Sequence, residues 1–283
     1  MKRAALLTLS LLTLPLLSSA LAQSSEPLPA SEIRLPHPLG DAFLLLPDAC
    51  APSCSLIVVS HSRGMTAELS LTRPHLRRLF GAFTNAGFAV LVSNDAGSAS
   101  WGAPPVLAYL ADVRSRAIRD FAFSGRTYNF GYSMGGLPAL LTAYAGVYPV
   151  SGALLLDAQV NLLDAWQGIN PTFSAEVTAA HELNPQLPLP FGRDPLHDYS
   201  NTRARQLPLF VAGSPQDIVV SFARNGEALY RESASLQSQL LTLSGPHLGM
   251  SHFGDAVILG ALSFLNQIER TEQIGSAPPR GQP

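Results

Sequence analysis

Short apolar runs alternate along the chain with stretches in which apolar residues recur at helical spacing. The runs are rich in aliphatic and β-branched side chains, as are strands that are buried on both faces of a parallel sheet. They occupy residues 41–46, 56–60, 88–93, 127–132, 152–156, 207–213 and 239–244. We therefore predict a strand for each run.

Helical spacing is clearest between residues 76 and 83, where apolar side chains recur at i, i+3, i+4 and i+7. Thr72 is placed to cap this helix and Gly87 to end it. Further helices are predicted at 106–121, from Ser133 to about 148, at 220–233 and at 255–266. Repeated strand–helix units predict the α/β class, with a mostly parallel central sheet and helices on both faces.

Residues 158–203 interrupt this alternation. The segment contains Pro171, Pro185, Pro188, Pro190 and Pro195, with aromatic residues scattered between them. Closely spaced prolines are unfavourable inside long helices and central strands. We predict that the segment is an insertion that forms a cap over the ligand site, because ligands of such sheets bind beyond the carboxyl ends of the strands.

The two ends of the chain differ from its middle. Residues 1–22 combine Lys2 and Arg3 with a short apolar run and Ala20-Leu21-Ala22, which is the pattern of a cleaved signal peptide. Residues 269–283 are polar, contain two adjacent prolines and are predicted to form a disordered tail. Residues 23–268 then form one α/β domain.

Composition narrows the range of functions. Hydrophobic residues make up 47% of the chain and charged residues 13%, enough to bury a large core. The formal net charge is −2, with no basic block, which disfavours nucleic-acid binding. No stretch after the signal peptide is predicted to span a membrane. The mature protein is therefore predicted to be secreted or periplasmic.

Cys50 and Cys54 are the two cysteines of the chain. An oxidising export compartment would allow them to pair as a disulfide. A metal site would need more ligands than these two thiols, and no cluster of histidines or aspartates lies beside them in the sequence. We predict a structural disulfide just before the strand at 56–60.

The segment from Gly131 to Gly136 matches the pattern G-x-S-x-G, with Ser133 at its centre. It follows an apolar strand and opens a helix, which is the context in which this pattern forms a nucleophile elbow. The serine must occupy a strained turn, and the glycines relieve crowding against neighbouring backbone. The turn presents the hydroxyl, and the Met134 N–H can stabilise an oxyanion.

From about Asp41 to Asn266 the chain resembles the α/β-hydrolase superfamily, above all its secreted esterase-like and dienelactone-hydrolase-like members. The resemblance is carried by His61-Ser62-Arg63-Gly64, the segment Gly131 to Gly136, Gly213-Ser214-Pro215-Gln216-Asp217 and Gly245-Pro246-His247. It implies a serine hydrolase with a Ser-His-Asp triad and no metal or organic cofactor.

The order of the triad in this fold is serine, then an acid, then histidine. Only His247 and His252 follow the last predicted strand, and motif position favours His247 as the base. Asp217 is favoured as the acid, with Asp157 as the alternative because some members place the acid one strand earlier. Each residue taken alone could instead be a polar loop residue or a helix cap.

The loop after the strand at 56–60 resembles the segment that supplies the second oxyanion donor. We assign this donor to the Arg63 N–H, with Ser62 as the alternative, since Ser62 stands where glycine is usual. Arg63 would also favour an anionic substrate group. Trp101 follows the strand at 88–93 and either lines the substrate pocket or is an ordinary packed aromatic residue.

These residues predict hydrolysis of a carboxylic ester, with a small-molecule or lipid substrate, through an acyl-enzyme. Two alternatives remain open from the sequence. A non-catalytic binding protein could use the same scaffold, and an acyltransferase or lipase would use the same triad.

Overall fold

The computed structural model describes residues 31–275, and the backbone forms one eight-stranded sheet in the order β1-β2-β4-β3-β5-β6-β7-β8. Strands β2 and β4 are antiparallel, as are β1 and β2, whereas all pairs from β4 to β8 are parallel. The strands are β1 (Ser31–Leu35), β2 (Ala42–Leu46), β3 (Cys54–Ser60), β4 (Ala89–Val92), β5 (Phe123–Tyr132), β6 (Gly152–Leu156), β7 (Leu209–Gly213) and β8 (Gln239–Thr242).

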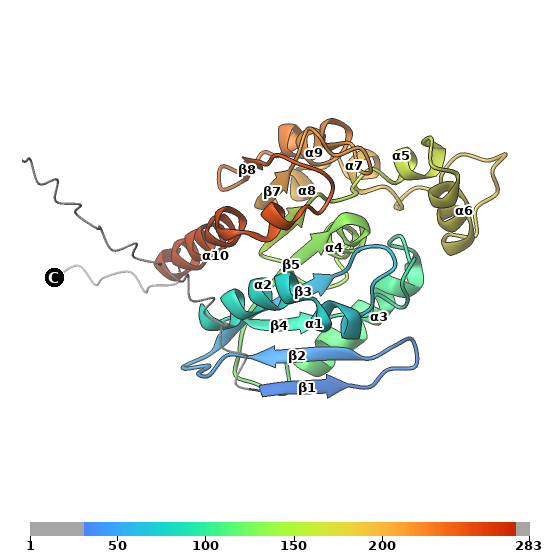
Figure 1. Cartoon of the computed structure of the whole chain (residues 1–283). Coiled ribbons are helices and arrows are strands. Elements are labelled where there is room, and N and C mark those ends of the chain that lie inside the picture. The colour runs from blue at the N-terminus through green and yellow to red at the C-terminus, as the bar shows by residue number, and fades with distance from the viewer. Residues whose placement is uncertain (1–30, 276–283) are drawn as a thin grey trace, which may run out of the picture.

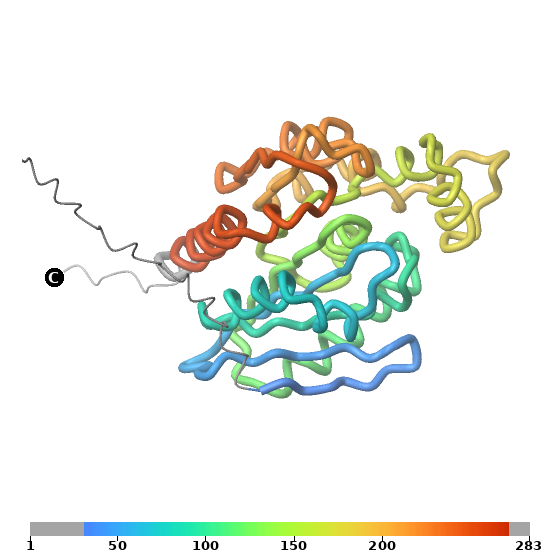
Figure 2. Tube along the Cα trace, viewed as in Figure 1, coloured from blue at the N-terminus to red at the C-terminus, as the bar shows by residue number. Residues whose placement is uncertain are grey.

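Every predicted strand is present, within a few residues of its predicted bounds. Strand β1 was not predicted. It lies at the edge of the sheet, pairs only with β2 and carries the polar residues Glu32 and Arg34, so it has no continuous apolar run to reveal it. Figure 2 shows this N-terminal hairpin in blue at one edge of the sheet, far from the orange and red C-terminal elements.

Helices cover both faces of the sheet (Figure 1). They are α1 (Ala67–Thr72), α2 (Pro74–Asn85), α3 (Pro104–Ala117), α4 (Gly136–Tyr144), α5 (Leu162–Gln167), α6 (Pro171–Ala180), α7 (Pro195–Asp198), α8 (Thr202–Arg205), α9 (Gly226–Glu232) and α10 (Asp255–Gly275). One face packs its apolar side chains against α2 and α10. On the other face, α3 covers β2, β3 and β4, while α4 and α9 cover β6 and β7.

Several predicted helix boundaries are wrong. Helix α3 ends at Ala117 and not at 121, α4 ends at Tyr144 and not near 148, and α9 starts at Gly226 and not at 220. Thr72 does not cap α2: it ends α1, whose own N-cap is Thr66, and Arg73 precedes Pro74 at the start of α2. Helix α10 does not end at about residue 266, because it continues to Gly275.

The tail predicted from residue 269 therefore starts too early. Glu269 is held against the sheet, where its carboxylate accepts hydrogen bonds from Ser55 Oγ at 2.6 Å and Tyr128 Oη at 2.9 Å and pairs with Arg126. The polar composition of this segment suggested a disordered tail. The residues that bind the Glu269 carboxylate lie far away in the sequence, so no local pattern reveals them. Residues 276–283 lie outside the described residues.

The segment 158–203 contains short helices separated by loops. Helices α5 and α6 project beyond the carboxyl ends of the parallel strands (Figure 1). Their apolar faces form a cluster with Trp101, with Met134 in the turn that follows β5, and with Leu137 of α4. The segment is therefore tied to the end of the sheet where the predicted site residues lie.

The disulfide prediction is confirmed: Cys50 and Cys54 are joined, with their Cα atoms 5.1 Å apart. Within the described part of the chain, no helix has the length and hydropathy that crossing a bilayer requires. The predicted signal peptide, residues 1–22, lies outside the described residues.

Candidate active site

Ser133 occupies a sharp turn between β5 and α4. Its φ is +53°, a left-handed conformation that side-chain-bearing residues rarely adopt. It begins a short 3₁₀ turn, η1 (Ser133–Gly135), which continues directly into α4. The turn lies at the carboxyl end of a central strand, and the first N–H groups of a helix have no acceptor inside that helix.

The flanking glycines are required by close backbone contacts. A Cβ on Gly135 would lie 2.2 Å from the Ser60 carbonyl oxygen, and one on Gly131 would lie 2.4 Å from the Gly135 carbonyl oxygen. Cβ atoms in proteins are essentially never found closer than 3.0 Å to such atoms. The G-x-S-x-G pattern therefore has a local steric cause: only glycine lets the turn fold tightly between β3, β5 and α4.

His247 connects Ser133 to Asp217. The Nε2 atom of His247 lies 2.9 Å from Ser133 Oγ, and its Nδ1 lies 2.6 Å from Asp217 Oδ2. All three come from loops at the carboxyl ends of β5, β7 and β8. A serine, an imidazole and a carboxylate linked in this order form the arrangement that activates a serine hydroxyl.

The Asp217 carboxylate is fixed by its surroundings. Its Oδ1 accepts hydrogen bonds from the N–H groups of Val219 and Val220, at 2.8 and 2.9 Å. Its neighbour Gln216 accepts a hydrogen bond from the Gly245 N–H at 2.7 Å and so joins the acid loop to the histidine loop. The sequence pattern did not single out Gln216, although its position beside Asp217 was a usable signal.

Asp157 and His252, the alternative acid and base, pair with each other. His252 Nδ1 lies 2.6 Å from Asp157 Oδ2, and its Nε2 lies 3.1 Å from the Ser244 carbonyl oxygen. Both side chains have no exposed surface. The Leu248 N–H also donates to Asp157 Oδ2, at 2.8 Å. Both ring nitrogens of His252 thus have partners other than Ser133.

The two acids are neighbours. One ligand-type atom from each of Asp157, Asp217 and His247 falls within 4.8 Å of the others. Such a cluster could in principle hold a metal ion. However, the 2.6 Å between His247 Nδ1 and Asp217 Oδ2 is a hydrogen-bond distance and leaves no space for an ion between them.

The loop after β3 contains Arg63 within a tight turn. The Met65 N–H donates to the Ser62 carbonyl at 3.1 Å, and Gly64 has a φ of +78°, as expected for the third residue of a type II turn. Arg63 is then the second residue, whose N–H takes no part in the turn hydrogen bond. This geometry fits an oxyanion donor, together with the Met134 N–H at the start of η1.

His61 supports this loop. Its side chain is fully buried, and its two ring nitrogens face the carbonyl oxygens of Ser62 and Asn94, at 2.9 and 3.0 Å. The His61 N–H donates to the buried Asp95 carboxylate at 2.7 Å.

The expected role of the Arg63 side chain in attracting anions does not fit the structure. Its guanidinium forms a bidentate salt bridge with Glu176 of α6, in which both N–O distances are 2.6 Å. The hydrogen bond from Arg63 holds the pKa of Glu176 below its usual value, and the same bond raises the pKa of Arg63. The positive charge is therefore already compensated. Sequence reasoning missed Glu176, which no local motif marks.

Trp101 lies inside the cluster rather than along an open surface. Only 2% of it is exposed, and it packs on Phe173 with ring centroids 5.0 Å apart. Its Nε1–H donates to Glu176 at 3.1 Å, and its carbonyl accepts from His181 Nε2 at 2.9 Å. This position favours the packed-aromatic alternative over the pocket-lining one. Trp101 anchors α6 beside the site.

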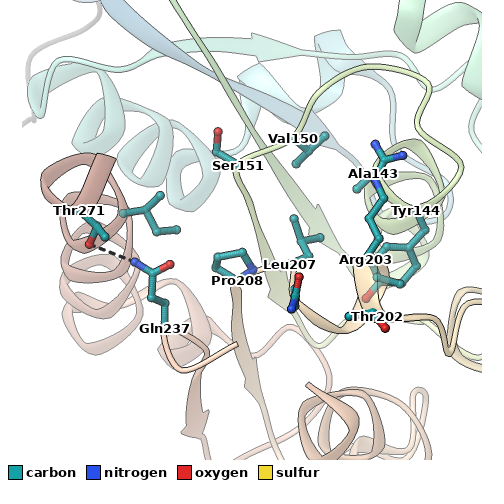
Figure 3. Close-up of a pocket in the computed structure, with 13 residues that line it drawn as sticks. Ala143, Tyr144, Val150, Ser151, Thr202, Arg203, Leu207, Pro208, Gln237 and Thr271 are labelled. Carbon is teal, nitrogen blue, oxygen red and sulfur yellow. Dashed lines mark hydrogen bonds between the residues drawn. The ribbon is translucent and has the colours of Figure 1, made fainter. Parts of the chain in front are cut away.

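A hollow of about 680 Å³ lies at the other end of the sheet (Figure 3). Ser151 and Pro208, which immediately precede β6 and β7, lie in its wall, as do Arg203 and the hydrogen-bonded pair Gln237 and Thr271. Ser133, Asp217 and His247 lie at the opposite end of the sheet, after the carboxyl ends of β5, β7 and β8. This hollow is therefore separate from the triad arrangement.

Solved structures with the same architecture come from several organisms. Est1E from Butyrivibrio proteoclasticus has a TM-score of 0.64 at 16% identity, over 84% of this chain and 99% of that one. FphF, a fluorophosphonate-binding serine hydrolase of Staphylococcus aureus, has a TM-score of 0.64 at 16% identity, over 83% and 97%. Carboxyl esterase 2 of Tuber melanosporum has a TM-score of 0.58 at 15% identity, over 89% and 88%.

The chain has the α/β-hydrolase fold. This agrees with the fold predicted from the sequence. No protein-family model matches the sequence, and no curated protein matches it either. At identities this low the structural likeness establishes the fold, whereas function must be argued from the site residues.

Proposed function

We propose that this protein is a serine hydrolase that cleaves carboxylic esters. The observation that carries the proposal is the continuous hydrogen-bonded chain from Ser133 Oγ through His247 to Asp217, at 2.9 and 2.6 Å. It stands on a nucleophile turn whose serine has a φ of +53°. An intact chain of this kind also argues against a binding protein that has lost its chemistry.

The proposed mechanism follows from this geometry. His247 takes the Ser133 proton as Oγ attacks the ester carbonyl, and Asp217 stabilises the imidazolium that forms. The Met134 and Arg63 N–H groups bind the oxyanion. His247 then protonates the leaving alcohol, and a water molecule attacks the acyl-enzyme with His247 again as base. Each step needs only groups of this chain.

We propose an ester with an apolar part as the substrate. The residues that follow Asp217 and His247 in their loops are apolar and exposed: Ile218 is 94% exposed, Val219 47% and Met250 71%. Apolar side chains grouped next to reactive residues favour apolar ligands. The Arg63–Glu176 pair leaves no uncompensated positive charge from Arg63 for an anionic group.

Export also remains part of the proposal. The Cys50–Cys54 disulfide supports it, because such bonds persist in oxidising compartments and are rare in the cytosol of most organisms.

A fluorophosphonate probe tests the proposed function. The purified protein is reacted with the probe beside Ser133→Ala, and the adduct is located by mass spectrometry. We expect one adduct at Ser133 and none in the variant. Ester hydrolysis is then measured with a series of acyl chain lengths. A folded wild-type protein that neither takes up the probe nor hydrolyses any of these esters would overturn the proposal and favour a binding protein.

A further inference from the structure

The hydrogen bonds of the Asp157–His252 pair require two protons on the ring nitrogens and the carboxyl group together, one more than a neutral histidine beside a carboxylate provides. The Ser244 carbonyl can only accept a hydrogen bond, so the Nε2 atom of His252 that faces it at 3.1 Å must carry a proton. The 2.6 Å contact between Nδ1 and Asp157 Oδ2 needs a second proton, on the ring or on the carboxyl group. Either placement makes the pair neutral overall.

The Asp217–His247 pair needs only one proton. His247 Nδ1 donates to Asp217, whereas Nε2 faces Ser133 Oγ, a hydroxyl that can itself donate. This pair therefore has a charge of −1 in the state that is ready to act as a base. The two neighbouring pairs have the same residue types but different numbers of protons.

Burial gives a physical reason for the neutral state. Asp157 Oδ1 is buried and accepts no hydrogen bond from another described residue. A carboxylate of this kind without a countercharge would be costly, and more so with the Asp217 carboxylate inside the same 4.8 Å cluster. A proton shared with His252 removes this cost.

We propose that the Asp157–His252 pair is a positioning and charge-compensating device for His247. It holds the loop of the base, because Asp157 Oδ2 accepts both the Leu248 N–H and the His252 ring. It also neutralises a second carboxylate beside Asp217, so that His247 faces one net negative charge and not two. The proposal assumes the proposed function only in naming His247 as the base.

Other charged groups on the elements around His252 do not change this charge count. His252 lies in the 3₁₀ turn η3 (Met250–Phe253), which packs against α2 and α10. The strand ends contribute Asp157, Asp217 and His247. Helix α2 contributes His75, the exposed Arg77, and Arg78, which pairs with Asp255 of α10 at 2.5 Å. Helix α10 also carries Glu269, which pairs with Arg126, and Arg270. The His75 ring contacts Phe253, and the Arg78–Asp255 pair is itself neutral.

Nuclear magnetic resonance of ring-¹⁵N-labelled histidine tests the proton count in the full-length protein. At about pH 8, where an ordinary histidine is neutral, we expect a protonated Nε2 on His252 and a second proton in the contact with Asp157. We expect one proton, on Nδ1, for His247. An unprotonated Nε2 on His252 would overturn the proposal, whatever the enzyme activity.

Matched carboxylate-to-amide variants test the charge compensation. Asp217→Asn removes a negative charge beside His247 and should lower the pH midpoint of its titration by at least about one unit. Asp157→Asn should shift the same midpoint by less than about 0.3 unit, because His252 then releases its extra proton and the pair stays neutral. The same spectra show that release.

The proposal would be contradicted if Asp157→Asn lowered the pH midpoint of the His247 titration by one unit or more while His252 carried a single ring proton in both the wild type and the variant. That result would show that the Asp157 charge is not compensated. These titrations do not need turnover. Failure of the fluorophosphonate reaction with an intact proton count would therefore count against the proposed function alone.

Discussion

Two Asp–His pairs lie side by side at the carboxyl end of this sheet, and they differ in solvent exposure and in the partners of their histidine nitrogens. The side chain of His247 is 13% exposed and its free nitrogen faces Ser133. The side chain of His252 is fully buried and both of its nitrogens face acceptors. The same two residue types thus form the pair that we propose to be reactive, where one nitrogen faces a hydroxyl, and a buried pair in which both nitrogens face other acceptors.

The largest expected difference between the pairs is in turnover. His247→Gln should lower kcat/KM for an ester by about 10⁴-fold or more, because the proposed general base is lost. His252→Gln keeps a donor near the Ser244 carbonyl and should cost less than about 100-fold at alkaline pH. Steady-state kinetics check this, with His197→Gln on the surface as control. A loss of kcat/KM that is larger in His252→Gln than in His247→Gln would reverse the assignment of the base.

The acids should differ in the same direction. Asp217→Asn should lower kcat by about 10³–10⁴-fold, since the imidazole loses its orientation and its countercharge. Asp157→Asn keeps an acceptor for Leu248 and should lower kcat by less than about tenfold. Burst kinetics with an activated ester measure both. Equal losses would indicate that the two carboxylates act as one unit.

Stability should reverse the order. Asp157→Ala leaves a buried histidine without its partner and should reduce the free energy of unfolding by about 3–5 kcal/mol. Asp217→Ala should reduce the free energy of unfolding by about 1–3 kcal/mol, because the N–H groups of Val219 and Val220 lose their acceptor. The loss is smaller than for Asp157→Ala because solvent reaches the His247 side chain. Urea denaturation compares the two variants. If the Asp157→Ala variant were more stable than the Asp217→Ala variant, the buried pair would not have the structural role assigned to it.

Acidification extends the comparison to a third histidine. Burial lowers the pKa of His181 below its usual value, and its Nδ1 is buried without a partner. The contribution of His181 to stability is therefore complete above about pH 6.5, the usual value. It is lost as the pH falls through the lower folded-state pKa, because protonation adds a buried N–H with no acceptor.

Hydrogen exchange of α6 checks this expectation. Between pH 7.5 and 5 the protection of α6, corrected for the intrinsic rate, should fall by about tenfold. The variant His181→Gln should show little change over the same range. Equal pH dependence in both proteins would show that another group loosens α6.

The smallest expected effect concerns substrate charge. Arg63→Gln should change the ratio of kcat/KM for anionic and neutral esters by less than about threefold, because Glu176 already compensates the guanidinium. Glu176→Gln should free that charge and favour the anionic ester by about three- to tenfold. A strong selective loss in Arg63→Gln would restore the anion-binding role that the sequence suggested.

Local patterns were sufficient for the nucleophile region. The glycines around Ser133 are required by contacts within a few residues and with β3, so their spacing alone indicates the turn. Strands β3, β4, β6 and β7 are buried along their whole length and are visible as apolar runs. In contrast, the edge strand β1 and the last turns of α10 are polar, and only their distant partners show that they are ordered.

By itself, the sequence determined the α/β class, the order of the strands along the chain, the nucleophile turn and a short set of candidate acids and bases. Only the tertiary structure decided how these candidates pair. Asp157 and Asp217 follow neighbouring strands and His247 and His252 share one loop, so chain order permits either pairing. Distances of 2.6 Å within each pair, and a serine facing only one of them, select between them. The reason is physical: hydrogen bonds depend on positions in space, which residues far apart in sequence acquire only when the sheet is assembled.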